Sequence, residues 1–324
     1  RQHETAAHAY PLLLLSPFSS AVRESMSGVR ARAIALTLSV VAVSHRHGAG
    51  DTIDVPGDQP TIQEGILAAS AGDTVLVAPG TYTSELDTRL DFCGRNIVLS
   101  SSGGPTDTVL DAGGFAPIIS LHSGEDSTSV ISGFTFSNGG SDNAAVRCQY
   151  ASPRIRNCVF SGNAGRYGAL YIGSSFTATV RACEFTGNAG DLGGAVYASG
   201  ALGRFVDCSF EGNEAEDGGA VYLAFSAETR FDSCRFLMNE AQKGGAVYSM
   251  NAESRFEACS FWGNEADHGS AVYLNESHNP PEFHRCSFVA NDGGTLYSLV
   301  ADAVVTNSIL AFDRTGPALT CLLG

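Results

Sequence analysis

The sequence has little charge, little tryptophan and no long apolar run. Of 324 residues, 16% are charged and one is Trp, while 37 are Gly. Coiled coils and long helices need periodic helix-forming sequence, and disordered chains need high charge with few apolar residues. No stretch reaches the roughly 18 apolar residues that a membrane-spanning helix needs. The composition therefore indicates an ordered chain with many turns.

Positive charge is also scarce. Acidic residues number 34 and basic residues 19, which gives a formal net charge of −15. A surface of this sign repels phosphate backbones and anionic lipids. Nucleic-acid binding is therefore excluded as the main activity.

The first 50 residues have the composition of an export signal. A basic pair, Arg30 and Arg32, precedes a ten-residue apolar run, 34–43, and small residues follow it. This order predicts a signal peptide over 26–50, preceded by an upstream extension over 1–25, and a secreted or bacterial outer-membrane (cell-surface) location. The run is too short to span a bilayer. The alternative is that it forms a buried strand or helix.

A repeat with a period of 25 to 27 residues occupies the second half of the chain. Each unit contains Cys-x-Phe, an Asn three residues after the Phe, a short polar loop, and a strand that begins Gly-Gly-Ala-Val-Tyr or a close variant. The repeated residues are Cys158, Cys183, Cys208, Cys234, Cys259 and Cys286; Phe160, Phe185, Phe210, Phe236, Phe261 and Phe288; and Asn163, Asn188, Asn213, Asn239, Asn264 and Asn291. A fixed period of this length, without helical periodicity, predicts a solenoid.

Each repeat must bend at several points. A further apolar residue stands three positions before each Cys, as Ile155 and Phe205 do. An odd offset cannot share one face of a flat strand with Cys-x-Phe, so the chain has to bend between them. This gives at least three straight segments per coil, as in an all-β parallel β-helix. In-register stacking would turn the repeated residues into structural ladders of Cys, Phe, Asn and Tyr.

The segments before the repeats predict a cap and less regular coils. Residues 61–64 (Thr-Ile-Gln-Glu) form a capping box, and Ile62, Ile66 and Leu67 would make the apolar face of a short N-terminal capping helix. Within a β-helix domain over 51–324, we predict the cap over 51–72, irregular coils over 73–156 and repeat coils over 157–324.

The irregular coils contain four predicted strand regions, and the far end has no predicted cap. The strand regions are 74–82, 96–100, 108–111 and 130–136. Because no capping segment follows the last repeat, we expect the protein to continue beyond Gly324.

The sequence resembles two known groups of proteins. The alternating Phe-x-x-Asn and Gly-Gly-Ala-Val motifs resemble the polymorphic outer-membrane protein repeats of chlamydial surface proteins. Residues 51–82, with Gln-Pro-Thr-Ile-Gln and Ala-Gly-Asp-Thr-Val-Leu-Val-Ala-Pro-Gly-Thr-Tyr, resemble the N-terminal cap and first coil of the pectin-lyase-like superfamily. The resemblance implies a single-stranded right-handed parallel β-helix, a secreted or outer-membrane location, and an adhesive role in some members and carbohydrate cleavage in others.

No catalytic constellation can be found in the repeats. Polysaccharide lyases on this fold need clustered carboxylates for calcium and a base beside the substrate. The outward position between Cys and Phe holds no such cluster, and Lys243, the only Lys, is predicted in a turn. Catalytic and cofactor-binding residues are therefore assigned as none. The sequence favours a non-enzymatic surface, adhesive or scaffold module. We expect it to be a monomer with cell-surface glycans or proteins as partners.

Two other functions remain open. One is a polysaccharide lyase or epimerase that acts on polyuronides, with its site in the irregular coils between Asp87 and Asp142. The other is a passive spacer for a missing C-terminal domain.

The loops after each Asn are acidic and provide weak calcium candidates. The candidates are Glu214, Glu216, Asp217, Glu265 and Asp267, and similar loops hold Asp191, Glu240 and Asp292. No loop has the Asp-x-Asp spacing of a dedicated calcium site. A solvated acidic edge is therefore favoured over shared calcium ions, and no other metal or cofactor is expected.

Three further sets of residues that repeat from coil to coil, Cys, Arg and Tyr, have structural interpretations. The repeated Cys residues are expected to be buried free thiols rather than disulfides or metal ligands, since parallel in-register side chains point the same way. Arg204, Arg230 and Arg255 would point to solvent or pair with nearby carboxylates. The Tyr of each Gly-Gly-Ala-Val-Tyr segment alternates with Val, so only one of the two sets faces the core.

Overall fold

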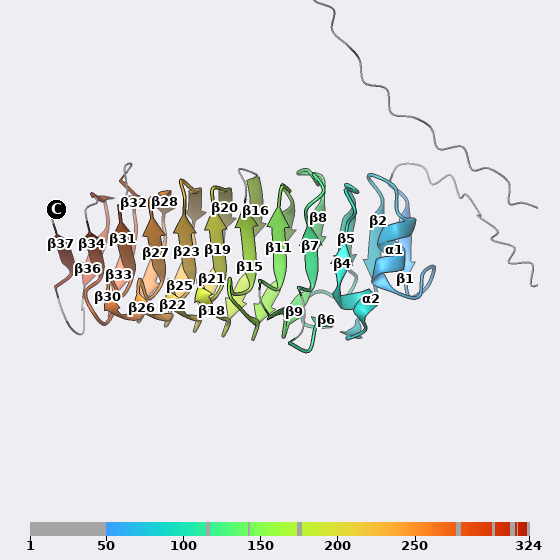
Figure 1. Cartoon of the computed structure of the whole chain (residues 1–324), viewed down its shortest axis with the longest axis horizontal. Helices are drawn as coiled ribbons and strands as arrows, with labels where there is room; N and C mark the ends of the chain where they lie inside the picture. Colours follow the sequence, from blue (N-terminus) through green and yellow to red (C-terminus); the bar gives the residue numbers. More distant parts are fainter. Residues whose placement is uncertain are drawn as a thin grey trace, which may run out of the picture. The chain divides into compact units, whose positions relative to one another are not determined.

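The structure is a computed structural model that describes residues 50–114, 117–141, 143–173, 177–276, 280–299, 302–311, 315 and 317–322. The predicted extension and signal peptide lie outside these residues, apart from Gly50. Strands of successive coils stack side by side from the end that carries helix α1 to strand β37 (Figure 1). All the strand pairs are parallel in the part described. The predicted all-β parallel β-helix with a short capping helix is confirmed.

Two of the sheets run the length of the stack. Sheet A contains β1 (Thr52–Val55), β2 (Thr74–Val77), β5 (Val98–Ser101), β8 (Val130–Ser132), β12 (Arg154–Arg156), β16 (Thr177–Arg181), β20 (Leu202–Val206), β24 (Glu228–Asp232), β28 (Glu253–Glu257), β32 (Glu282–His284) and β35 (Val304–Thr306). Sheet B contains β3 (Gly80–Tyr82), β6 (Thr108–Asp111), β9 (Thr135–Ser137), β13 (Val159–Ser161), β17 (Glu184–Thr186), β21 (Ser209–Glu211), β25 (Arg235–Leu237), β29 (Ser260–Trp262), β33 (Ser287–Val289) and β36 (Ile309–Ala311).

A third long sheet and a shorter fourth complete each coil. Sheet C contains β4 (Leu90–Asp91), β7 (Ile119–Leu121), β11 (Val146–Gln149), β15 (Leu170–Gly173), β19 (Val196–Ser199), β23 (Val221–Ala224), β27 (Val247–Met250), β31 (Val272–Asn275), β34 (Leu296–Leu299) and β37 (Leu319–Leu322). Sheet D contains β10 (Gly140–Ser141), β14 (Ala164–Gly165), β18 (Ala189–Leu192), β22 (Glu214–Asp217), β26 (Glu240–Lys243) and β30 (Glu265–His268). The polar loop predicted after each repeated Asn is therefore a strand of sheet D, except after Asn291, where Asp292 forms an isolated bridge.

A short helix, α1 (Ile62–Ala68), covers the first coil. The Thr61 hydroxyl accepts the backbone N–H of Glu64, as the capping box predicts. Ile62 and Ile66 are fully buried, whereas Leu67 is 50% exposed, so its predicted place on the apolar face is wrong. Residue 67 is five positions after Ile62, which turns it about 140° away from that face.

The second helix and the divided strands were not predicted from the sequence. Helix α2 (Glu85–Thr88) is one turn long and packs beside α1. The predicted strands 74–82 and 130–136 each divide into two strands that belong to sheets A and B. At the second division, Gly133 has φ +82°. Within the described residues, no helix is long and apolar enough to cross a membrane.

The bend inferred from the odd apolar spacing lies at the residue before each repeated Cys. These residues have left-handed φ angles of about +50°, namely Asn157, Ala182, Asp207, Ser233, Ala258 and Arg285. The left-handed conformation has a modest energetic cost for a non-Gly residue, and Asn and Asp adopt it most readily. The chain thus turns from sheet A into sheet B, and both apolar sets point inward.

Two columns of apolar side chains fill the core between sheets A and B. The repeated Phe residues stack face to face on sheet B, with ring centroids 4.5 Å apart for Phe160 and Phe185. Phe231 of sheet A meets Phe236 edge to face at 5.6 Å and 67°. Stacked and edge-to-face pairs are both favourable aromatic geometries. The core is therefore fixed both along the stack and across it.

The repeated Asn residues form a fully hydrogen-bonded ladder. The Nδ2 of Asn213 donates to Oδ1 of Asn239 at 2.9 Å and to the backbone oxygen of Phe185 at 3.0 Å. Its own Oδ1 accepts the backbone N–H and Nδ2 of Asn188. The same pattern links Asn163 through to Asn291. Buried amides are thus satisfied without water.

The repeated Cys residues are free, buried thiols, as expected. Each Sγ donates to backbone oxygens, for example from Cys183 to Arg181 at 3.4 Å and to Ile155 at 3.8 Å. Burial, followed by its hydrogen bond with Cys158, raises the pKa of Cys183. The thiols therefore serve as small apolar side chains at the turn into sheet B.

Candidate functional site

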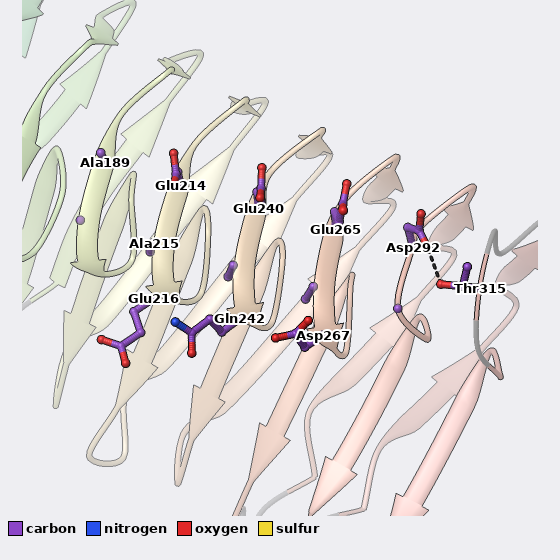
Figure 2. Close-up of a pocket in the computed structure, with 14 residues that line it drawn as sticks. Ala189, Glu214, Ala215, Glu216, Glu240, Gln242, Glu265, Asp267, Asp292 and Thr315 are labelled. Carbon is purple, nitrogen blue, oxygen red and sulfur yellow. Dashed lines mark hydrogen bonds between the residues drawn. The ribbon is translucent and has the colours of Figure 1, made fainter.

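An acidic groove of about 790 Å³ lies along sheet D. Glu214, Glu240 and Glu265 stand in register on neighbouring strands, and Asp292 continues the row through an isolated bridge. Figure 2 shows this row on one side and a second row, with Glu216, Gln242 and Asp267, on the other. Small residues such as Ala215 lie between them. Parallel strands are about 4.8 Å apart, so the row of Glu214, Glu240 and Glu265 brings like charges close together, whereas the neutral Gln242 separates Glu216 from Asp267 in the second row.

The structure does not bring the five calcium candidates together. Glu214 and Glu216 are on β22, whereas Glu265 and Asp267 are on β30, with β26 between them. Asp217 lies on the face of β22 opposite to Glu214 and Glu216, in register with Lys243. Among the described residues, no group of three or more His, Cys, Asp or Glu side chains is arranged to hold a metal ion. Calcium binding stays a hypothesis without a defined ligand set.

The outward face of sheet A carries an array of opposite charges. Arg204, Arg230 and Arg255 stand in register, beside Glu228 and Glu253. Two of the three Arg form ion pairs, Arg204–Asp232 at 3.1 Å and Arg255–Glu282 at 2.9 Å. These pairs are exposed, so each contributes at most about 1 kcal/mol.

A groove of about 620 Å³ follows this array of charges on sheet A. Arg230 has no carboxylate within 4.0 Å among the described residues, although Arg204 and Arg255 on either side of it are paired. The groove is lined by a column of Arg and a column of Glu, each repeated from coil to coil. This face therefore has the composition of a solvated surface.

The Tyr column lies on the outer face of sheet C, and Val occupies the inner face. Tyr197, Tyr222, Tyr248 and Tyr273 are nevertheless only 5–7% exposed, because their rings stack on one another. The Tyr222 and Tyr248 centroids are 4.8 Å apart and nearly parallel. Burial, with a smaller contribution from Tyr248, raises the pKa of Tyr222. These stacked rings therefore do not form an open aromatic surface.

Lys243 lies in a column beside the Tyr rings rather than in a simple turn. Asp217, Lys243 and His268 are in register on β22, β26 and β30. Burial raises the pKa of Asp217, and Lys243 opposes that shift. The His268 ring is 5.0 Å from the ring of Tyr297. An acid, an amine and an imidazole are thus neighbours here, which sequence reasoning missed because the column appears only when sheet D is known.

The irregular coils hold a second set of polar groups. Asp87, one limit of the region considered for a lyase site, accepts the N–H of Ile62 at 2.9 Å and so caps α1. Glu125 is 1% exposed and accepts the N–H groups of Gly94 and Ser123, which ties two neighbouring coils together. Asp142, the other limit, lies outside the described residues. The carboxylates at Asp87 and Glu125 are therefore structural.

Around Glu125, three polar side chains reach the surface. His122 Nε2 is 3.9 Å from Asp91 Oδ2, and Cys93 is an exposed thiol with φ +52°. Burial and Asp91 raise the pKa of Cys93. No hydrogen bond joins Cys93 to His122 in the part of the chain described, so the thiol lacks the activating base of a nucleophile.

Comparison with known proteins agrees with this architecture. The family described as "Right handed beta helix region" matches residues 145–310, just over half of the chain, and the chain belongs to that family. One similar solved structure is a mannuronic acid specific polysaccharide family 6 lyase enzyme from human gut microbiota. The TM-score is 0.51 at 15% identity, over 76% of this chain and 64% of the lyase. At that identity the likeness shows the fold alone. No curated protein matches the chain.

Proposed function

We propose that the chain is a non-enzymatic, exported β-helix that acts as a surface, adhesive or scaffold module. The observation that carries this proposal is the repetition of its outward columns. An active site is a unique convergence of groups, whereas Glu214, Glu240 and Glu265, or Arg204, Arg230 and Arg255, repeat the same group from coil to coil. Repeated columns suit binding or spacing better than catalysis.

Location and partners follow from the sequence resemblance. The Phe-x-x-Asn and Gly-Gly-Ala-Val units resemble polymorphic outer-membrane protein repeats, and the basic and apolar residues over 26–50 resemble a signal peptide. These features support secretion or attachment at a bacterial outer membrane. The partners proposed are cell-surface glycans or proteins, bound by a monomer.

A polysaccharide lyase or epimerase is the second candidate. Two observations favour it, namely the fold shared with the mannuronic acid specific lyase and the neighbouring Asp217, Lys243 and His268. A lyase needs a base that removes a proton from the sugar and a group that neutralises the uronate. Fold alone does not confer this activity.

One experiment separates these functions. The whole chain is incubated with polymannuronate, polyguluronate and polygalacturonate, with and without calcium, and unsaturated ultraviolet-absorbing products are followed. We expect no product. Product that disappears in Lys243→Ala or His268→Ala, but not in Arg230→Ala on sheet A, would overturn the non-enzymatic proposal and locate the active site.

A further inference from the structure

A column of stacked phenol rings runs along the outer face of sheet C. Neighbouring ring centroids are 4.8–5.6 Å apart, and neighbouring planes are within 15° of parallel. Each coil supplies one ring, and the members in register are Tyr171, Tyr197, Tyr222, Tyr248, Tyr273 and Tyr297. The column therefore brings oxidisable side chains from distant parts of the sequence into direct contact.

Tyr222 and Tyr248 make the closest contact in this column. Their centroids are 4.8 Å apart with planes at 5°, and their Cα atoms are paired in register on β23 and β27. The ring carbons next to the two hydroxyl groups therefore face each other. The stacked rings form a cluster apart from the main core, so two of them can tilt together without displacing core side chains.

The charges beside the column favour loss of an electron from its middle rather than from its beginning. The Arg147 Cζ is 5.9 Å from the centre of the Tyr171 ring, and a neighbouring cation opposes removal of an electron. Burial is the main cause that raises the pKa of Tyr222 and Tyr248, and the nearby Asp217 adds a smaller contribution. The same negative charge stabilises an electron-deficient ring.

We propose that neighbouring rings of the Tyr column, first Tyr222 and Tyr248, are joined by one-electron oxidation into dityrosine cross-links between coils. Each phenol gives up one electron and one proton, and the two phenoxyl radicals form a bond between the carbons next to their oxygens. The hydrogen on each joined carbon then moves to an oxygen, which restores both phenols. The two electrons and two protons reduce the O–O bond of a peroxide, as when hydrogen peroxide becomes two water molecules.

The fold supplies what this reaction needs apart from the oxidant. Two radicals held side by side react far faster than two that must meet by diffusion. A cross-link between Tyr222 and Tyr248 closes a loop of one coil, so it restricts the unfolded chain as a disulfide does. The modification does not depend on the proposed surface function, because it needs only the column and a peroxide.

The test is photo-oxidation of the whole chain by ruthenium tris-bipyridine, with persulfate as the peroxide. Trypsin cleaves after Arg230, Arg235 and Lys243, so Tyr222 and Tyr248 fall in different peptides. Mass spectrometry then identifies the joined peptides by the loss of two hydrogen atoms. We expect this cross-link to be the most abundant and its yield to be unchanged when the protein is diluted, because both rings belong to one molecule.

Tyr248→Phe keeps the stacked ring and removes the phenol. It should abolish both cross-links of residue 248 and keep the one between Tyr197 and Tyr222. Tyr82→Phe is the matched control, because Tyr82 lies on β3 of sheet B, and it should leave the pattern unchanged. The oxidised wild-type chain should melt at a higher temperature than before oxidation, and more so than oxidised Tyr248→Phe.

Four outcomes would overturn the inference. They are cross-links that disappear on dilution, the same pairs at equal yield in the urea-denatured chain, equal cross-linking of Tyr82, and oxidation of Met250 without any joined Tyr. Met250 is the competing group, since its Sδ accepts the Tyr222 hydroxyl at 3.7 Å and a thioether is readily oxidised.

Discussion

Asn213 makes more hydrogen bonds through its side chain than a surface amide usually does. It donates to the coils on both sides and accepts two N–H groups from Asn188. Asn213→Ala leaves those donors and the Phe185 carbonyl buried and unsatisfied, so we expect a loss of about 3 kcal/mol or more. Urea denaturation of this variant and of the control Ser209→Ala measures it. A loss below about 1 kcal/mol would show that the ladder contributes little.

Thiol reactivity follows from burial at each Cys. Cys93 is exposed, whereas Cys148 and the six repeated Cys are buried. We expect a thiol reagent to label Cys93 within minutes and the buried residues only after denaturation, because only an accessible thiolate reacts. Peptide mapping by mass spectrometry assigns each label. Fast native labelling of several repeated Cys would refute this interpretation.

The sequence predicted well the residues that repeat. Cys, Phe and Asn recur at fixed spacing, and identical side chains stacked in register have one consistent arrangement. Leu67 was misplaced because a helix of only seven residues gives little periodicity. Arg147 and Glu125 were missed because the irregular coils differ in length, so no alignment of the chain on itself places them beside Tyr171 or Gly94.

The Gly pair that precedes each strand of sheet C combines two different constraints. Gly218 has φ +69°, whereas Gly219 is restricted by space, since a Cβ there would lie 2.2 Å from the Gly245 oxygen. Gly219→Ala should therefore cost about 3 kcal/mol, the upper end for overpacking. The coil must shift its neighbour's backbone to accept the methyl group.

The control for Gly219 is Gly212, at the turn into sheet D. It has φ +59° and open space, and Met238 occupies the same position one coil later with φ +51°. Gly212→Ala should cost only about 1 kcal/mol. Urea midpoints followed by circular dichroism compare the two variants, and equal losses would contradict the steric explanation.

The Tyr stack makes stability fall at alkaline pH. Burial raises the pKa of Tyr197, Tyr222, Tyr248 and Tyr273 above the ordinary value of 10.0. Above about pH 10 the unfolded chain loses protons that the folded chain keeps, so the folded state loses stability as pH rises. Below pH 10 both states are protonated, and this contribution is fully present.

Absorbance of tyrosinate and circular dichroism, followed together from pH 8 to pH 12, test this behaviour. We expect most ionisation to coincide with unfolding, and Tyr222→Phe, which keeps the stacked ring, to be less sensitive to alkali. Full ionisation of a chain that keeps its fold would be the contrary result.

For the solenoid as a whole, the acidic rows are a source of repulsion that the core offsets. Glu240 stands between Glu214 and Glu265, and like charges directly opposite are destabilising by about 0.2–1 kcal/mol. Glu240→Gln should therefore raise the melting temperature, more at low salt than at high salt. Glu184→Gln, whose neighbours in register are Val159 and Ser209, is the control with the same change in charge.

Equal stabilisation by the two variants would mean that net charge, and not the row, is responsible.

Millimolar calcium extends the same experiment. We expect no change in the melting temperature, because no group of three or more carboxylates among the described residues is arranged to hold a metal ion. A rise in wild type that Glu240→Gln abolishes would establish shared calcium ions.

The direction of the backbone hydrogen bonds has a mechanical consequence. In all the long sheets described, the bonds join one coil to the next, so they point along the stacking axis while the covalent chain runs across it. A pulling force along that axis loads the bonds of one interface at a time. Each rupture would release a coil of about 25 residues, or about 85 Å of extended chain. The repeat coils would therefore yield in nearly equal steps.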